Sequence, residues 1–77
     1  MTPKVGDFYC HYRNQKMYQL LHIGYIQETL EPCVIYQAQY DTEDLGEKPI
    51  FVRPLKEFCE EVEVEERMVL RFQKIIV

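Results

Sequence analysis

The sequence has 77 residues, of which 47% are hydrophobic and 29% are charged, and its formal net charge is −4. A chain of this length and composition forms one globular domain, so we expect a single folded unit over residues 1–77. An acidic chain has no general affinity for nucleic acid, because phosphate groups are neutralised by clustered Lys and Arg. Residues 1–25 carry Lys4, Arg13 and Lys16 against Asp7, a balance of +2, while the remainder of the chain has a balance of −6.

The cysteines and the apolar runs predict a cytoplasmic protein. Cys10, Cys33 and Cys59 are odd in number and widely spaced, whereas a disulfide scaffold has an even set at tight spacing. Residues 1–16 contain no apolar stretch of the kind found in a signal peptide. The longest apolar runs are a few residues, far below the ~20 that span a membrane. We therefore expect reduced thiols and no membrane contact.

The N-terminal half of the chain predicts two strands joined by a turn. Residues 7–13 alternate with a period of two, so odd and even positions lie on opposite faces. One face is expected to carry Phe8, Cys10 and Tyr12, and the other, outer face Asp7, Tyr9, His11 and Arg13. Residues 14–16 form a polar turn, and residues 17–26 form a second strand with a bulge expected at Gly24.

The second half predicts further strands and one short helical turn. Residues 33–40 form the clearest strand, with Val34, Tyr36, Ala38 and Tyr40 sharing one face, which we expect to be packed in the core. A polar loop over 41–49 leads to a short strand over 50–53 and to a helical turn within 55–60 that turns Leu55, Phe58 and Cys59 inward. Residues 61–65 and 68–73 alternate as two strands, with a hairpin tip at residues 65–67. The alternative for 56–74 is a helix, which the Val-Glu alternation disfavours.

These elements predict a mainly β fold: a small SH3-like barrel of five or six antiparallel strands with at most one short helical turn. Short strands at intervals of about 8–12 residues are typical of small barrels and sandwiches. Closure into a barrel also removes the exposed strand edges that so small a domain could not cover. Homodimerisation through an edge strand is a possible addition that the sequence does not decide.

Four motifs in this order resemble those of a bacterial family of small proteins known only as a domain of unknown function. They lie in HYR (11–13), ETLE (28–31), VIYQAQY (34–40) and FVRPL (51–55), and the resemblance extends over roughly residues 6–76. It implies a compact, mainly β, intracellular domain, and it implies no known reaction or ligand. The chain departs from the family pattern at Ile26-Gln27, where members carry His-Ser, at Phe51, where they carry Trp, and at Asn14-Gln15, where they carry Gly.

No motif in the sequence predicts a metal site, a cofactor or catalysis. Zinc ligands come in convergent pairs, whereas Cys10 and His11 are neighbours that point to opposite faces of a strand. The chain contains no serine, and each cysteine sits in an apolar pattern that raises rather than lowers the pKa of a thiol. We expect the cysteines to serve as small hydrophobic residues and the protein not to be an enzyme.

The candidate binding residues are polar side chains of the first strand, the second turn and the fourth strand. They are Tyr9, His11, Arg13, Glu28, Thr29 and Arg53. Pro54 forces Arg53 into an extended conformation, and its guanidinium group suits a carboxylate or a phosphate. A structural reading of the same residues is equally simple: Arg53 pairs with Glu28, Thr29 caps the turn and His11 packs along Tyr9.

The sequence thus favours a non-enzymatic binding or interaction module whose partner is an unidentified protein or a small anionic ligand. One alternative is a domain that binds single-stranded nucleic acid, which would need Arg13, Lys16 and Arg53 on one surface beside exposed Tyr rings. The other is a small-molecule sensor or enzyme subunit, which would need a closed pocket lined by the face of Tyr36 and Tyr40.

Overall fold

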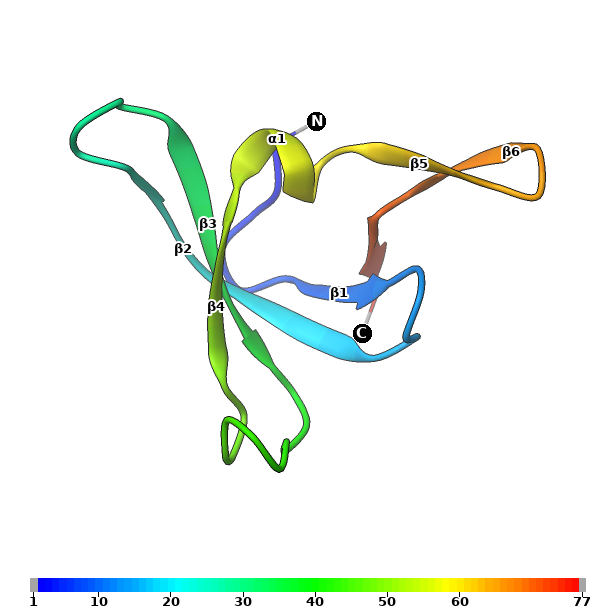
Figure 1. Ribbon diagram of the computed structural model, residues 1–77, viewed down its shortest axis with the longest axis horizontal. Helices are drawn as coiled ribbons and strands as arrows, with labels where there is room; N and C mark the ends of the chain where they lie inside the picture. Colours follow the sequence, from blue (N-terminus) through cyan, green and yellow to red (C-terminus); the bar gives the residue numbers. More distant parts are fainter. Residues whose placement is uncertain (1, 77) are drawn as a thin grey trace.

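The computed structural model describes residues 2–76 and shows a mainly β protein with one short helix (Figure 1). The strands of the first half are β1 (Phe8–His11), β2 (Met17–Tyr25) and β3 (Pro32–Ala38). The second half contains β4 (Ile50–Pro54), α1 (Leu55–Phe58), β5 (Glu61–Val64), β6 (Arg67–Leu70) and β7 (Phe72–Ile75). The antiparallel, mainly β fold with a single helical turn that the sequence predicts is confirmed.

Five strands form one antiparallel sheet in the order β4-β3-β2-β1-β7. In a flat sheet of this order the outer strands would lie about 19 Å apart, because neighbouring strands are about 4.8 Å apart. Instead, the guanidinium carbon of Arg53 in β4 lies 5.5 Å from the ring centroid of Phe72 in β7. The sheet is therefore rolled as in a barrel, and its two edge strands approach each other through side chains without pairing in the described residues.

The register of β2 and β3 contains an irregularity, but it is not at the glycine. Gly24 pairs regularly with Cys33, while the register shifts between Leu20 and His22. The extra residue is thus Leu21, and the expected bulge at Gly24 is wrong. The bulge lets β2 bury Tyr18 and Leu20 on one side of it and turn Ile23 towards the core on the other.

The C-terminal strands divide between two sheets. β5 and β6 pair only with each other and form a hairpin that projects from the body (Figure 1), which we call the arm. Its tip at Glu65 and Glu66 confirms the predicted hairpin. The predicted single strand over 68–73 is wrong, because the chain leaves the arm at Arg71 and β7 then joins the edge of β1.

The inner side of the rolled sheet is filled by aromatic side chains. The buried core consists of Tyr9, Tyr18, Leu20, Val34, Tyr36, Ala38, Phe58 and Phe72, against which Tyr40 and Phe51 pack. The predicted core face of β3 is confirmed, and α1 delivers Phe58 to it, with the Phe58 ring stacked 4.2 Å from Phe72. The expectation that Cys59 faces inward is wrong, because it is exposed at the end of α1.

No helix in residues 2–76 has the length and apolar character needed to cross a membrane. The strands with one unpaired edge in the five-stranded sheet are β4 and β7. Pairing of two copies through one of these edges stays a prediction.

Candidate functional site

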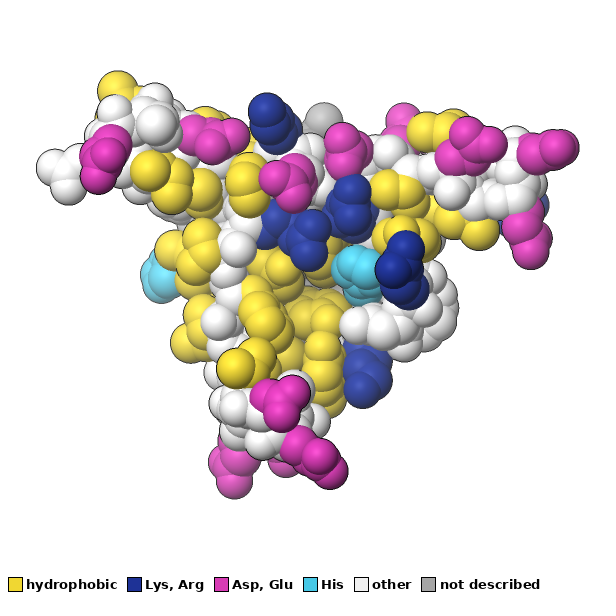
Figure 2. Space-filling view, viewed as in Figure 1, with side chains coloured by type: hydrophobic (Ala, Val, Ile, Leu, Met, Phe, Trp, Pro, Cys, Tyr) yellow, Lys and Arg dark blue, Asp and Glu magenta, His cyan; other side chains and the backbone are white. Residues whose placement is uncertain are grey.

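Three cationic or titratable side chains from distant parts of the chain come together where the rolled sheet nearly closes. They are His11 at the end of β1, Arg53 in β4 and Arg71 in the link between β6 and β7. Arg13, in the turn after β1, lies close enough to act electrostatically on His11 as well. We call these four residues the Arg–His surface. Figure 2 shows Lys and Arg side chains gathered around a His near the middle of this side of the molecule, next to an area of hydrophobic side chains.

Arg53 is held in place by the sheet below it. Its Nε donates a hydrogen bond of 3.1 Å to the hydroxyl of buried Tyr36, and its guanidinium group lies over the ring of Phe72. The carboxylate of Glu57 lies 3.8 Å from Nη1 and balances part of the charge. The side chain is 28% exposed, so it still reaches solvent. A guanidinium fixed in this way is preorganised to meet an anion.

Arg71 is fixed by the segment that joins α1 to the arm. Its Nε donates to the backbone oxygen of Glu57 at 3.1 Å, and its Nη2 donates to the Glu60 carboxylate at 2.7 Å. The backbone N–H of Arg71 also donates to the backbone oxygen of Glu60. Arg71 thus joins the two ends of the arm at its base. The side chain of Arg71 is 21% exposed, so it stabilises the base of the arm and also forms part of the Arg–His surface.

His11 lies in a cationic environment. Its Nδ1 accepts the backbone N–H of Arg13 at 3.1 Å, which assigns the ring proton of the neutral form to Nε2. Burial, followed by the charges of Arg53, Arg71 and Arg13, holds the pKa of His11 below its ordinary value of 6.5. Every charge that shifts this pKa comes from an arginine, so the potential in front of the ring is positive although the whole molecule is acidic.

Aromatic rings adjoin the Arg–His surface. The ring of His11 meets Phe72 edge-on at 4.9 Å and lies 5.0 Å from Tyr12. Further along the same face, Tyr18 is flanked by the partly exposed rings of Tyr40 and Phe51, at 5.5 and 6.4 Å.

The hydroxyls of Tyr18 and Tyr40 share a short hydrogen bond of 2.5 Å. Burial and this bond raise the pKa of Tyr40 to about 12, so its ring stays neutral and offers an uncharged surface. Lys16 covers part of that ring, with Nζ 4.4 Å from the centroid.

The structure brings three of the predicted site residues together and separates the others. His11, Arg13 and Arg53 belong to one surface. Tyr9 does not, because it is 6% exposed and packs against Phe58; its assignment to an outer face is wrong. Tyr9 and His11 do share a face of β1, but that face is turned towards the core.

Glu28 and Thr29 lie in the loop at the far end of β2 from the turn that follows β1 (Figure 1). With about 3.3 Å per residue, β2 places this loop on the order of 25 Å from the β1–β2 turn. Thr29 accepts the backbone N–H of Glu31, as a turn-capping residue does. Arg53 pairs with Glu57 rather than with Glu28, so the expected ion pair is wrong while the capping role of Thr29 is confirmed.

Arg71 is the site residue that sequence reasoning misses. The sequence predicts that it belongs to one regular strand over 68–73, on the face opposite Phe72. The Met-Val-Leu-Arg-Phe pattern contains no glycine or proline to mark the break at Arg71. Only the long-range contact with Glu57 and Glu60 shows that the chain changes sheet there.

The described part of the chain offers no cluster of three or more His, Cys, Asp or Glu side chains that could hold a metal ion. Cys33 is buried beside the core, and Cys10 is partly buried. Burial raises the pKa of the Cys59 thiol, so the thiolate that a nucleophile or a metal ligand requires is disfavoured.

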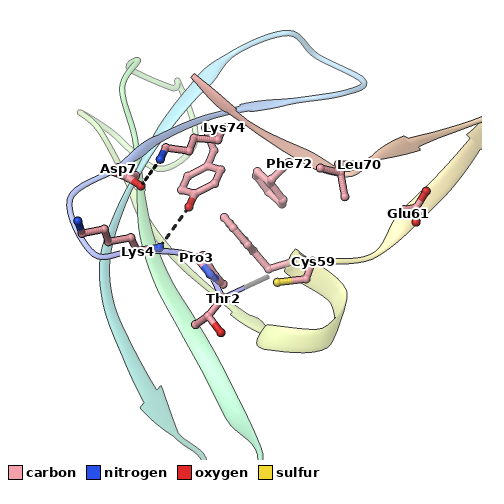
Figure 3. Close-up of a pocket in the computed structure, with 11 residues that line it drawn as sticks. Thr2, Pro3, Lys4, Asp7, Cys59, Glu61, Leu70, Phe72 and Lys74 are labelled. Carbon is pink, nitrogen blue, oxygen red and sulfur yellow. Dashed lines mark hydrogen bonds and ion pairs between the residues drawn. The ribbon is translucent and has the colours of Figure 1, made fainter. Parts of the chain in front are cut away.

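A separate hollow of about 420 Å³ lies between the N-terminal segment, α1 and the base of the arm (Figure 3). Its floor is apolar and includes Phe72 and Phe58. Part of its polar rim is already paired: Lys74 contacts Asp7 at 3.2 Å, and the backbone N–H of Lys4 donates to the Tyr9 hydroxyl at 3.3 Å. The hollow is therefore a weaker candidate for an anion than the Arg–His surface.

Packing on the inner side of the sheet excludes one predicted alternative. Tyr36 is 4% exposed and contacts the rings of Tyr18, Phe51, Phe58 and Phe72. The predicted closed pocket lined by Tyr36 and Tyr40 is therefore wrong.

Comparison with curated proteins and with solved structures gives no significant match. Comparison with protein families does give one. The family described as "Protein of unknown function (DUF1653)" matches residues 7–74, which include every strand of both sheets except the last residue of β7. This chain therefore belongs to the DUF1653 family, whose function is unknown.

Proposed function

We propose that this protein is a non-enzymatic binding module whose Arg–His surface holds the anionic group of a ligand, either a phosphate or a carboxylate. The observation that carries the proposal is the convergence of His11, Arg53 and Arg71 from three separate segments on one partly exposed surface. Guanidinium groups bind phosphate and carboxylate through charge-assisted hydrogen bonds, which are about twice as strong as neutral ones. The Nε2–H of neutral His11 would add a further donor.

The distribution of charge supports this surface rather than another. Acidic side chains gather at the three projecting ends of the molecule, which are the β2–β3 loop, the β3–β4 loop and the tip of the arm (Figures 1 and 2). The Arg–His surface lies between them. In the middle, Arg13, Arg53 and Arg71 stand against the two carboxylates of Glu57 and Glu60, so an anion repelled at the three ends meets a net positive charge there. The proposal places the module in the cytoplasm, in keeping with its three unclustered cysteines.

The test is a titration with inorganic phosphate at constant ionic strength, followed by NMR on the isotope-labelled protein. We expect saturable shifts of the His11 ring signals and of the Nε–H signals of Arg53 and Arg71. Arg53→Gln should weaken binding about 10- to 150-fold, since one charge-assisted hydrogen bond contributes about 1.5–3 kcal/mol. Arg67→Gln, which removes a cation from the arm, is the matched control and should bind phosphate as the unaltered protein does.

Because Arg53 and Arg71 also support the fold, a second variant separates binding from folding. Arg13 is exposed in the turn, so Arg13→Gln should fold normally and weaken phosphate binding by a smaller factor than Arg53→Gln. If the NMR signals shift only with the ionic strength, and equally for every anion, the Arg–His surface is not an anion site.

A further inference from the structure

Phe51 and Arg53 form a ring and a cation side by side on one strand. They are two residues apart in β4, so their side chains project from the same face at a separation of about 7 Å. The ring of Phe51 leans on Tyr36 at 5.8 Å with the planes tilted by 35°, and it remains partly exposed. Tyr36 also accepts the hydrogen bond of Arg53, so one buried side chain positions both the ring and the guanidinium group.

The surroundings limit the size of the ligand. The molecule extends 37 × 29 × 25 Å, and acidic ends stand on three sides of the Arg–His surface (Figure 2). Charges are screened over about 8 Å at physiological ionic strength, so a long polyanion crossing this face would come within range of at least one acidic end. A compact ligand that stays in the middle of the face avoids this repulsion.

We propose that the ligand is a nucleoside monophosphate or a close chemical relative, with its base stacked on Phe51 and its phosphate on Arg53, Arg71 and His11. This inference rests on the anion-binding function proposed above. A nucleotide joins a planar ring to a phosphate at a separation comparable to that between Phe51 and Arg53. Nucleobases stack on aromatic side chains with little preference for sequence, because every base has a π-face. A single nucleotide also meets the size limit, whereas a nucleic-acid strand does not.

The experiment compares inorganic phosphate, ribose 5-phosphate, the four common ribonucleoside monophosphates and a ten-nucleotide RNA as probes of the whole protein. We expect at least one nucleoside monophosphate to bind about tenfold more tightly than ribose 5-phosphate, which corresponds to one stacked base. Phe51→Leu should abolish this difference, because the base loses the ring on which it stacks. Val52→Ala, on the opposite face of the same strand, is the matched control and should keep it.

The outcomes distinguish the nucleotide assignment from the anion-binding proposal on which it rests. Equal binding of ribose 5-phosphate and every nucleotide would overturn the nucleotide assignment and leave the anion-binding proposal standing. Failure of all the probes, inorganic phosphate included, would overturn the nucleotide assignment and the phosphate form of the anion-binding proposal. Tighter binding of the RNA than of any monophosphate would replace the compact ligand with a single-stranded nucleic acid. Thermal unfolding of the Phe51→Leu variant checks that it is still folded, so that a lost preference for nucleotides over ribose 5-phosphate cannot be caused by unfolding.

Discussion

At the scale of single residues, His11 shows how neighbouring charges alter a side chain that alternation alone would leave at the surface. Its ring is partly buried against Phe72 and faces the arginines of β4 and of the link before β7. An anion bound to these arginines would cancel their repulsion of a second proton on the ring. Binding of an anion and protonation of His11 should therefore favour each other, and an anion whose own charge stays constant over this range should bind more tightly as the pH falls through the pKa of this histidine.

The depressed pKa of His11 also predicts how stability depends on pH without a ligand. The unfolded chain takes up the proton near the ordinary pKa of 6.5, whereas the folded protein takes it up only at a lower pH. The stability that the neutral ring contributes is therefore complete above the unfolded pKa and is lost as the pH falls through the folded pKa. Urea unfolding between about pH 7.5 and pH 5.5 should show a decline that His11→Gln reduces and His22→Gln, at an exposed position of β2, does not. Equal slopes in both variants would show that His11 is not the group responsible.

At the scale of elements, the arm is the part of the structure with the fewest stabilising contacts to the rest of the protein. An isolated two-stranded hairpin is marginally stable in water, and β5 and β6 pair only with each other. Met68 is 58% exposed and no buried core residue comes from the arm. Its attachment is concentrated at the base, where Arg71 bonds to Glu57 and Glu60. We expect the arm to open locally well before the five-stranded sheet does.

The tip of the arm offers a direct way to stabilise it. Glu65 and Glu66 have φ values of 49° and 66°, so both occupy the left-handed region that a two-residue type I′ turn requires. Each such residue other than glycine or asparagine costs about 1 kcal/mol. The double variant Glu65→Asn/Glu66→Gly should slow amide hydrogen exchange in β5 and β6 by about tenfold. Exchange in β2 and β3 serves as the internal control, and unchanged exchange in the arm would contradict the assigned turn.

At the scale of the whole molecule, the rolled sheet depends on Phe72 more than on any edge pairing. Its ring stacks on Phe58, meets Tyr36 and Tyr18 edge-on and lies under the guanidinium group of Arg53. It thus links β7, at one edge of the sheet, with α1, β3 and β4. The same contacts hold His11 and Arg53 near each other, so the Arg–His surface exists because the sheet is rolled.

Phe72→Ala should therefore destabilise the protein by about 3–5 kcal/mol, the usual cost of removing a buried Phe ring. The total stability of a small domain is near the lower end of 5–15 kcal/mol, so this variant should keep only about 0–2 kcal/mol and be partly unfolded at ambient temperature. Circular dichroism with thermal and denaturant unfolding measures the loss. Met68→Ala, on the exposed face of the arm, should change stability by less than about 0.5 kcal/mol. A stable, cooperative Phe72→Ala protein would show that the roll does not depend on this ring.

Much of the local structure can be predicted from the sequence. The alternation in 33–40 identifies β3 and its buried face, the polar segments mark the turns, and Pro54 separates β4 from α1. The candidate site is predicted only in part. His11, Arg13 and Arg53 are recognisable as polar side chains near strand ends, while Arg71 is hidden in a pattern that reads as a regular strand.

The sequence by itself determined which residues share a face of each strand, because side chains alternate along an extended backbone whatever surrounds it. Only the tertiary structure decided which face of β1 turns inward, where β2 bulges and that β6 and β7 belong to different sheets. These features follow from contacts between residues far apart in the chain, such as Tyr9 with Phe58 and Arg71 with Glu57. Local periodicity carries no information on such contacts, since it is the same whether a strand pairs with one neighbour or another.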